Sequence, residues 1–199
     1  MSKIMVFTNL TLDGVMQAPG RPDEDTRGDF KHGGWAAPFA AMSEAGDALA
    51  FTGALLFGRR TYEDFYSFWP NQKDNPFTAI LNNVQKHVAS TTLEQPLPWS
   101  NSTLLKGDAT KTVSKLKVEQ DKDLLIFGSG VLVQALMRAN LINEYILLIH
   151  PLILGSGRRL FPDGGAFATL NLRDTKTTSK GVVIATYEPM SIVPEIPGE

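Results

Sequence analysis

The stretch "LLFGRRTYEDF", residues 55–65, has the form of a buried strand, a glycine and the start of a helix. The apolar run ends at Gly58, and Arg59 and Arg60 precede a helix expected at about 60–67. Cations at a helix N-terminus face the positive end of the helix dipole, which is unfavourable on a simple solvated surface. A bound anion removes this conflict, and strand–glycine–helix turns commonly hold phosphate. The stretch therefore predicts an anion site in a fold of alternating strands and helices.

A second turn of the same form occurs in "LLIFGSGVLVQALM", residues 124–137. An apolar strand leads into Gly128, Ser129 and Gly130, and a helix is expected at 130–138. Glycine also serves tight turns for purely structural reasons, and the pattern is not the six-position Rossmann fingerprint. If both strands belong to one parallel sheet, however, the two turns meet at its carboxyl edge, where such sheets bind ligands. The pair suggests a dinucleotide.

The rest of the chain continues this alternation. Short apolar segments predict strands at 3–9, 54–58, 86–90, 102–106 and 123–128. Helical spacing predicts helices at 36–46, 60–67, 76–83, 110–118 and 130–138. This order indicates an α/β fold with a largely parallel sheet covered on both faces. The last third, with strands at 143–154, 168–178 and 181–189 and no helix between them, predicts antiparallel additions to one edge.

Composition narrows the possible functions. The 199 residues suit one domain, assigned to 1–190, followed by a loose, Pro-rich tail at 191–199. A net charge of −2 argues against nucleic-acid binding. The lack of cysteine and the wide spacing of the three histidines predict no metal site, and a cytoplasmic location is expected. The N-terminus does not resemble a secretory signal, and no apolar run approaches a membrane span.

Three features leave alternatives open. The long connection at 16–34 is either functional or disordered, and its acidic residues, Glu24 among them, are by default solvated. Trp35 is either a core residue or the wall of a flat pocket. The glycine cluster at 154–161 is either a plain loop or a source of arginines for an anionic substrate.

Six motifs together resemble one known family. The chain is similar to the dihydrofolate-reductase-like superfamily, and specifically to small single-domain proteins that resemble the C-terminal reductase domain of the RibD riboflavin-pathway enzymes. The resemblance covers residues 3 to about 188 and rests on motifs in the family's order and spacing: "TLDG" (11–14), "LLFGRRTYEDF" (55–65), "FWP" (68–70), "LNNVQKHVAS" (81–90), "LLIFGSGVLVQALM" (124–137) and "NEYILLIHPLILGSGRRLF" (143–161). It implies a three-layer α/β/α fold with a mixed, mainly parallel eight-stranded sheet and antiparallel C-terminal strands.

The resemblance also implies NADPH as the cofactor, laid across the carboxyl edge of the sheet. Residues that match the family's cofactor-binding positions are Gly58, Arg59, Arg60 and Thr61 for the 2′-phosphate and pyrophosphate, Ser90 and Thr91 for the adenosine, Gly128, Ser129, Gly130, Val131 and Leu132 for the second glycine turn, and Thr8, Asn9, Val15 and Met16 for the nicotinamide. Arg59 matches the phosphate-holding position better than Arg60.

The chain departs from the family in its proton donor. Dihydrofolate reductases carry an acid on the first long helix, and here that helix offers only Glu44, near its end. The candidates are therefore Asp13, Glu24 or a water, with Trp35 as a third residue of the catalytic pocket. The zinc deaminase domain of bifunctional riboflavin enzymes is absent from this sequence, which has neither the cysteines nor the length for it.

These features lead to a functional hypothesis. The expected activity is NADPH-dependent hydride transfer to a small heterocyclic or carbonyl substrate, of the 5-amino-6-(5-phosphoribosylamino)uracil reductase type in riboflavin biosynthesis. The alternatives are a dihydrofolate or pterin reductase and a non-catalytic dinucleotide-binding module. The apolar run at 145–154, together with the resemblance to dimeric relatives, predicts a homodimer.

Overall fold

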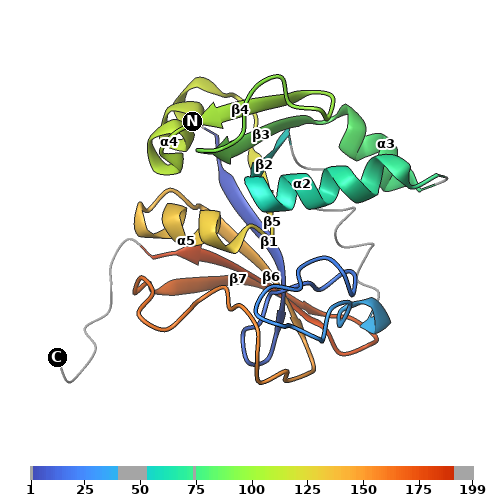
Figure 1. The fold of residues 1–199 in the computed structure, drawn as a ribbon. Coiled ribbons are helices and arrows are strands. Elements are labelled where there is room, and N and C mark those ends of the chain that lie inside the picture. Colours follow the sequence, from blue (N-terminus) through green and yellow to red (C-terminus); the bar gives the residue numbers. More distant parts are fainter. Residues whose placement is uncertain (1, 40–52, 74, 191–199) are drawn as a thin grey trace.

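The computed structural model describes residues 2–39, 53–73 and 75–190, and in this part of the chain eight strands form one mixed sheet (Figure 1). Their order across the sheet is β4 (Ser102–Lys106), β3 (Gln85–Ser90), β2 (Ala54–Gly58), β5 (Leu124–Phe127), β1 (Ile4–Thr11), β6 (Glu144–His150), β8 (Val183–Pro189) and β7 (Leu170–Thr177). The predicted eight-stranded, mainly parallel sheet with antiparallel C-terminal pairings is confirmed.

Two of the four described α-helices begin at side-chain caps that the sequence signals locally. The described helices are α2 (Arg59–Phe68), α3 (Pro76–Asn83), α4 (Ala109–Glu119) and α5 (Gly130–Arg138), with short 3₁₀ turns η1 (Ala37–Phe39) and η2 (Trp69–Asn71). Asn75 caps α3 by accepting the Phe77 N–H, and Asp108 caps α4 in the same way. The helix expected at 36–46 begins as η1, and its remainder, including Glu44, lies outside the described residues.

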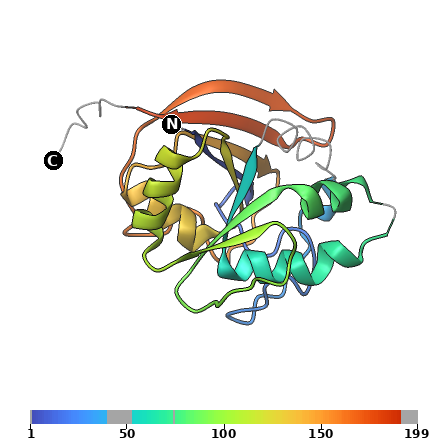
Figure 2. The ribbon, with the colours of Figure 1, turned by 90° about the horizontal axis from the view of Figure 1, so that it is seen from above.

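The helices pack in two layers on opposite faces of the sheet, as Figures 1 and 2 show. One core cluster joins Ile4 and Val6 of β1 to Val113 of α4 and Leu136 of α5. The other joins Phe7 and its neighbours to Tyr62 of α2 and Leu81 of α3. Successive β1 side chains point to opposite faces, so an apolar strand needs cover on both sides. This alternation produces the predicted three-layer α/β/α arrangement.

Strand β6 differs from expectation in its direction. It pairs parallel to β1, from Met5↔Glu144 to Thr11↔His150, and antiparallel only to β8. The helix α5 lies between β5 and β6 in the sequence, so these elements form a βαβ crossover, which requires parallel strands. The antiparallel pairings therefore start one strand later than predicted. Strand β6 is paired on both sides and its apolar residues pack into the cores on the two faces of the sheet, so it is not an edge strand. The C-terminal edge of the sheet is β7.

Candidate functional site

The two glycine turns lie side by side at the carboxyl edge of the sheet. Strands β2 and β5 are parallel neighbours, and both end at this edge. The Ser129 Oγ accepts the Gly58 N–H at 3.0 Å and donates to the Thr61 Oγ1 at 2.8 Å. One hydroxyl thus joins the start of α2 to the start of α5. The predicted meeting of the two turns is confirmed, although their cofactor contacts remain a prediction.

The backbone of the second turn explains its residues. Gly128 and Ser129 both have left-handed backbone angles, with φ of 57° and 59°. A Cβ atom at Gly128 would find nothing within 4 Å, so open space lies in front of this turn. Neither Gly58 nor Ser129 caps its helix with a side chain, so neither residue competes with a ligand for the first helical N–H groups. The arrangement suits an anion bound across two helix N-termini.

The loop after β1 reaches the same place. A Cβ atom at Gly130 would lie 2.7 Å from the Met16 Sδ, so a larger residue there would require the Met16 side chain to shift. The Met16 N–H donates to the Arg158 carbonyl at 2.8 Å, and the fully buried Val15 forms a β-bridge with Arg159. Of the predicted nicotinamide-facing positions, Met16 therefore adjoins the second glycine turn, whereas Val15 is buried beside Arg159.

The two arginines at the start of α2 differ in their surroundings. The Arg59 Nη1 lies 3.2 Å from the Glu63 Oε2, one helical turn away, and both side chains are more than a third exposed. Arg60 is exposed and has no ion pair within the described part of the chain. Such exposed ion pairs contribute little, so Glu63 leaves Arg59 available to a stronger anion.

The remaining predicted cofactor residues differ in how far their side chains are exposed and in whether they are already hydrogen-bonded. The Ser90 Oγ accepts the Thr92 and Leu93 N–H groups at 3.1 and 3.0 Å, which closes the turn after β3, and Thr91 is exposed beside it. Three further side chains are placed as follows: Thr8 is buried, Leu132 packs in the core, and Val131 is exposed on the first turn of α5. For Leu132, only the backbone can face a ligand.

The two acidic candidates have opposite electrostatic surroundings. The Thr11 hydroxyl and the N–H groups of Leu154 and Gly155 donate to Asp13 and lower its pKa to about 2. Asp13 is therefore ionised at neutral pH and ties the β1 turn to the 154–155 loop. Burial raises the pKa of Glu24, whose Oε2 accepts the Gly20 and Arg21 N–H groups. Of the two, Glu24 is the better proton source.

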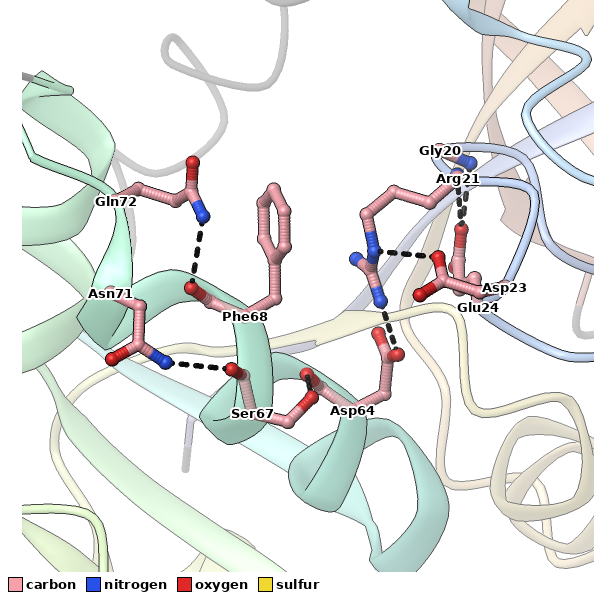
Figure 3. A network of polar contacts seen from close by, with 9 residues as sticks. All are labelled: Gly20, Arg21, Asp23, Glu24, Asp64, Ser67, Phe68, Asn71 and Gln72. Atoms are coloured by element: carbon pink, nitrogen blue, oxygen red, sulfur yellow. Dashed lines mark hydrogen bonds and ion pairs between the residues drawn. The ribbon is translucent and has the colours of Figure 1, made fainter.

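A salt bridge attaches the long loop at 16–34 to helix α2 (Figure 3). The Arg21 guanidinium pairs with Asp64 and lies 4.2 Å from the centre of the Phe68 ring. Figure 3 shows Glu24 on the loop side of this contact. The described structure thus orders the loop against the helix that begins at the first glycine turn.

Gln17 organises the same loop, and the sequence interpretation missed it. Its side chain is buried; Nε2 donates to the Asp25 and Arg27 carbonyls at 3.1 and 2.8 Å, and Oε1 accepts the Arg158 N–H at 3.0 Å. A buried amide with all these partners is stabilising, whereas the same group without them would be costly. No local pattern signals this role, because Arg158 is 141 residues away.

A buried polar pair lies beside Trp35. The Trp35 ring is buried and its Nε1–H donates to the Gln17 carbonyl at 2.7 Å. The fully buried His150 meets this ring edge-on at 5.2 Å between centroids, and its Nε2 lies 2.8 Å from the Asn9 Oδ1. Burial lowers the pKa of His150 to about 4. The sequence assigned His150 no site role.

His150 predicts a pH dependence of stability. Its pKa falls from 6.5 to about 4 on folding, so between these values the unfolded chain binds more protons. The free energy of unfolding should therefore rise with pH across this window, by at most about 1.4 kcal/mol per pH unit for one group, and level off above it. Urea denaturation as a function of pH measures this.

The matched variant for this experiment is His150→Phe, which keeps an aromatic ring in place. Its stability should depend less on pH than that of the unmodified chain in the acid window. His87, whose pKa burial also lowers, contributes in the same direction in both proteins and cancels from the comparison. Parallel curves for the two proteins would contradict the assignment.

Comparison with known proteins shows which family this chain belongs to. A family model described as the RibD C-terminal domain matches residues 2–185. The chain belongs to this family. Similar proteins include the uncharacterized protein YwjB of Bacillus subtilis, 31% identical over 188 residues, covering 90% of this chain and 94% of YwjB. The uncharacterized protein YyaP of the same organism is 27% identical over 145 residues, covering 71% and 76% of the two chains.

Solved structures share the fold of this RibD C-terminal domain. A putative riboflavin biosynthesis protein from Shewanella sp. PV-4 superposes with a TM-score of 0.66 at 21% identity, covering 94% of this chain and 99% of that one. A dihydrofolate reductase from Enterococcus faecalis, complexed with NADP(H) and RAB-propyl, superposes with a TM-score of 0.59 at 12% identity, covering 94% and 96% of the two chains. At these identities the likeness establishes the dihydrofolate-reductase-like fold.

Among the described helices, none is both long and apolar enough to cross a bilayer.

Proposed function

We propose that this RibD C-terminal domain protein is an NADPH-dependent reductase of a small heterocyclic or carbonyl substrate, of the riboflavin-pathway type. The observation that carries the proposal is the Ser129 hydroxyl, which joins the two glycine turns at the carboxyl edge of the sheet. Membership of the family supports the reductase class. The NADP(H) complex of the Enterococcus dihydrofolate reductase supports the choice of cofactor.

The residues present fit a dinucleotide. The pyrophosphate would lie against the open face of Gly128, within reach of the first N–H groups of α2 and α5. Arg59 would hold the 2′-phosphate, and Asn9 and Met16 would flank the nicotinamide. When bound, NADPH would supply the hydride, and the protein would supply position and electrostatics.

The proton for the reaction would come from Glu24 or a water. Asp13 is unsuitable because its hydrogen bonds keep it ionised at neutral pH. Trp35 would not supply the proton, because its ring is buried in the core under the 16–34 loop and its single donor is already bonded to the Gln17 carbonyl. Glu24 is poised to hold a proton closer to neutral pH, since burial raises its pKa.

Binding and turnover are tested in sequence. Calorimetry with NADPH and NADH first tests the cofactor. If the protein binds neither of them, the proposal is overturned. NADPH oxidation is then followed by absorbance with 5-amino-6-(5-phosphoribosylamino)uracil, with dihydrofolate and with a panel of small carbonyl compounds. Turnover of the uracil supports the riboflavin-type activity, and preferential turnover of dihydrofolate supports a pterin reductase. Binding without any turnover supports the non-catalytic module.

A homodimer is also proposed, although on different grounds from the apolar run in β6. Phe161 and Phe167 are 41% and 64% exposed and line a hollow with Met137 of α5. A second copy covering these rings would remove apolar surface from water. Light scattering at micromolar concentration should give twice the mass of one chain, and a monomer would contradict the proposal.

A further inference from the structure

Asn9 and His150 form a hydrogen-bonded polar pair on one face of the sheet. Asn9 is aligned with Leu148, and Thr11 with His150, so both side chains lie on the face that carries Phe7 and Leu148. Their Oδ1 and Nε2 atoms are 2.8 Å apart. Neither residue continues the apolar pattern of this face, and the covering rings are aromatic. A polar pair retained in such surroundings needs a reason.

The chemistry of the pair determines which nitrogen of His150 carries the proton. An amide oxygen can only accept, so a hydrogen bond to the Asn9 Oδ1 requires a proton on Nε2. The rings of Trp35 and Phe39 meet His150 edge-on, each at 5.2 Å between ring centroids. Neither these two rings nor Asn9 carries a charge. The pKa lowered by burial agrees with a neutral ring. The Nδ1 atom has no hydrogen-bond partner within the described part of the chain.

The same bond orients the Asn9 amide. Without a partner, an asparagine amide can turn over and exchange its oxygen with its nitrogen at little cost. The His150 donor removes this freedom, because Nε2–H tolerates only the oxygen at its end. Moving the proton to Nδ1 would leave a buried donor without a partner among the described residues, which is costly. The Asn9 Nδ2 has no acceptor among the described residues, and Asn9 is only half-buried. Its two N–H groups are therefore left for a ligand.

We propose that His150 is a positioning residue, whose Nε2–H holds Asn9 so that the amide N–H groups are presented to a carbonyl oxygen of the bound ligand. This inference rests on the proposed function, which places the nicotinamide beside Asn9. The carbonyl belongs either to the nicotinamide carboxamide or to the substrate. Both sources present the same acceptor chemistry, and a neutral hydrogen bond of this kind changes affinity roughly three- to tenfold.

A double-mutant cycle tests the coupling. NADPH affinity is measured by calorimetry for His150→Phe, Asn9→Ala and the double variant, and His87→Phe serves as a control because His87 is another buried histidine, on β3. If His150 acts through Asn9, each single variant loses about three- to tenfold and the double variant loses no more. His150→Gln, which can donate to the same oxygen, should recover most of the loss. Additive losses, or an equal loss in the His87 control, would overturn the proposal.

Two further arms identify the acceptor. The probe 2′-phospho-ADP-ribose lacks the nicotinamide, so its affinity should not change in any variant if the carboxamide is the acceptor. If the substrate supplies the carbonyl, NADPH affinity also stays constant, and kcat/KM for the substrate that turns over falls by the same non-additive factor. The proposal is overturned if the variants change neither the NADPH affinity nor kcat/KM.

The free protein gives an independent readout. Nitrogen–proton NMR correlations of the His150 ring should show the Nε2–H tautomer at neutral pH, and a proton on Nδ1 would overturn the proposal. This measurement needs no ligand. If the NMR result is as expected but the protein binds no dinucleotide, the failure lies in the proposed function. If NADPH binds and the cycle is additive, the failure lies in the role of His150.

Discussion

Replacement of Arg59 by alanine is expected to weaken NADPH binding by about one to two orders of magnitude and to leave NADH binding almost unchanged. A charge-assisted hydrogen bond to the 2′-phosphate contributes roughly 1.5–3 kcal/mol, and NADH lacks that phosphate. Arg59 begins α2 next to the joined glycine turns, and its existing partner, Glu63, is an exposed ion pair of little strength. Calorimetry with both cofactors measures the difference.

Arg60→Ala is the matched control for this experiment. Arg60 carries the same charge one position along, but it is exposed and should affect NADPH affinity far less. Arg59→Ala should also flatten the dependence of NADPH binding on salt, because a charge pair that salt screens has been removed. Equal weakening of NADPH and NADH would mean that Arg59 supports the turn and does not recognise the phosphate.

Replacement of Gly157 by alanine is expected to destabilise the protein by about 3 kcal/mol or more. Gly157 has a φ of 119°, and an added Cβ atom would lie 2.7 Å from the Val15 Cγ1 and 2.8 Å from the Phe30 Cε2. Both neighbours belong to the small core under the 16–34 loop and are buried, so neither can move away cheaply. Chemical denaturation gives the change in the free energy of unfolding.

Gly155→Ala separates the two causes of this effect. Gly155 also has a positive φ, 73°, but nothing lies within 4 Å of an added Cβ atom. Its substitution should therefore cost only the backbone strain, about 1–2 kcal/mol. If the two variants were equally unstable, the collision with Val15 and Phe30 would play no part, and the 154–160 loop would adjust to the added methyl group.

Local chemistry made much of the fold predictable. The strands expected at 54–58 and 102–106 and the helices at 76–83 and 130–138 have the predicted bounds. Each is delimited by signals at or next to its ends, such as Asn75 and Pro76 at the start of α3 and the glycines at the start of α5. The meeting of the two glycine turns was also predictable, because the carboxyl ends of parallel strands share one edge.

The prediction of β6 shows where local signals are insufficient. Its length and apolar character identified it as a strand, but pairing depends on partners elsewhere in the chain. The approach to β1 brings Glu144 opposite Met5, and nothing within 143–154 encodes that alignment. The same limit applies to the site, where Gln17 and His150 each bond to a residue 141 positions away.

The sequence by itself therefore determined the elements, the three-layer class and the two turns that face a common edge, because periodicity, caps and glycines act over a few residues. Only the tertiary structure decided that Asp13 accepts hydrogen bonds that join two loops, that Gln17 organises the 16–34 loop and that His150 lies within hydrogen-bonding distance of Asn9. These roles arise from burial and from hydrogen bonds between distant segments. A side chain's pKa and the direction of its amide are properties of that surrounding, which no short stretch of sequence contains.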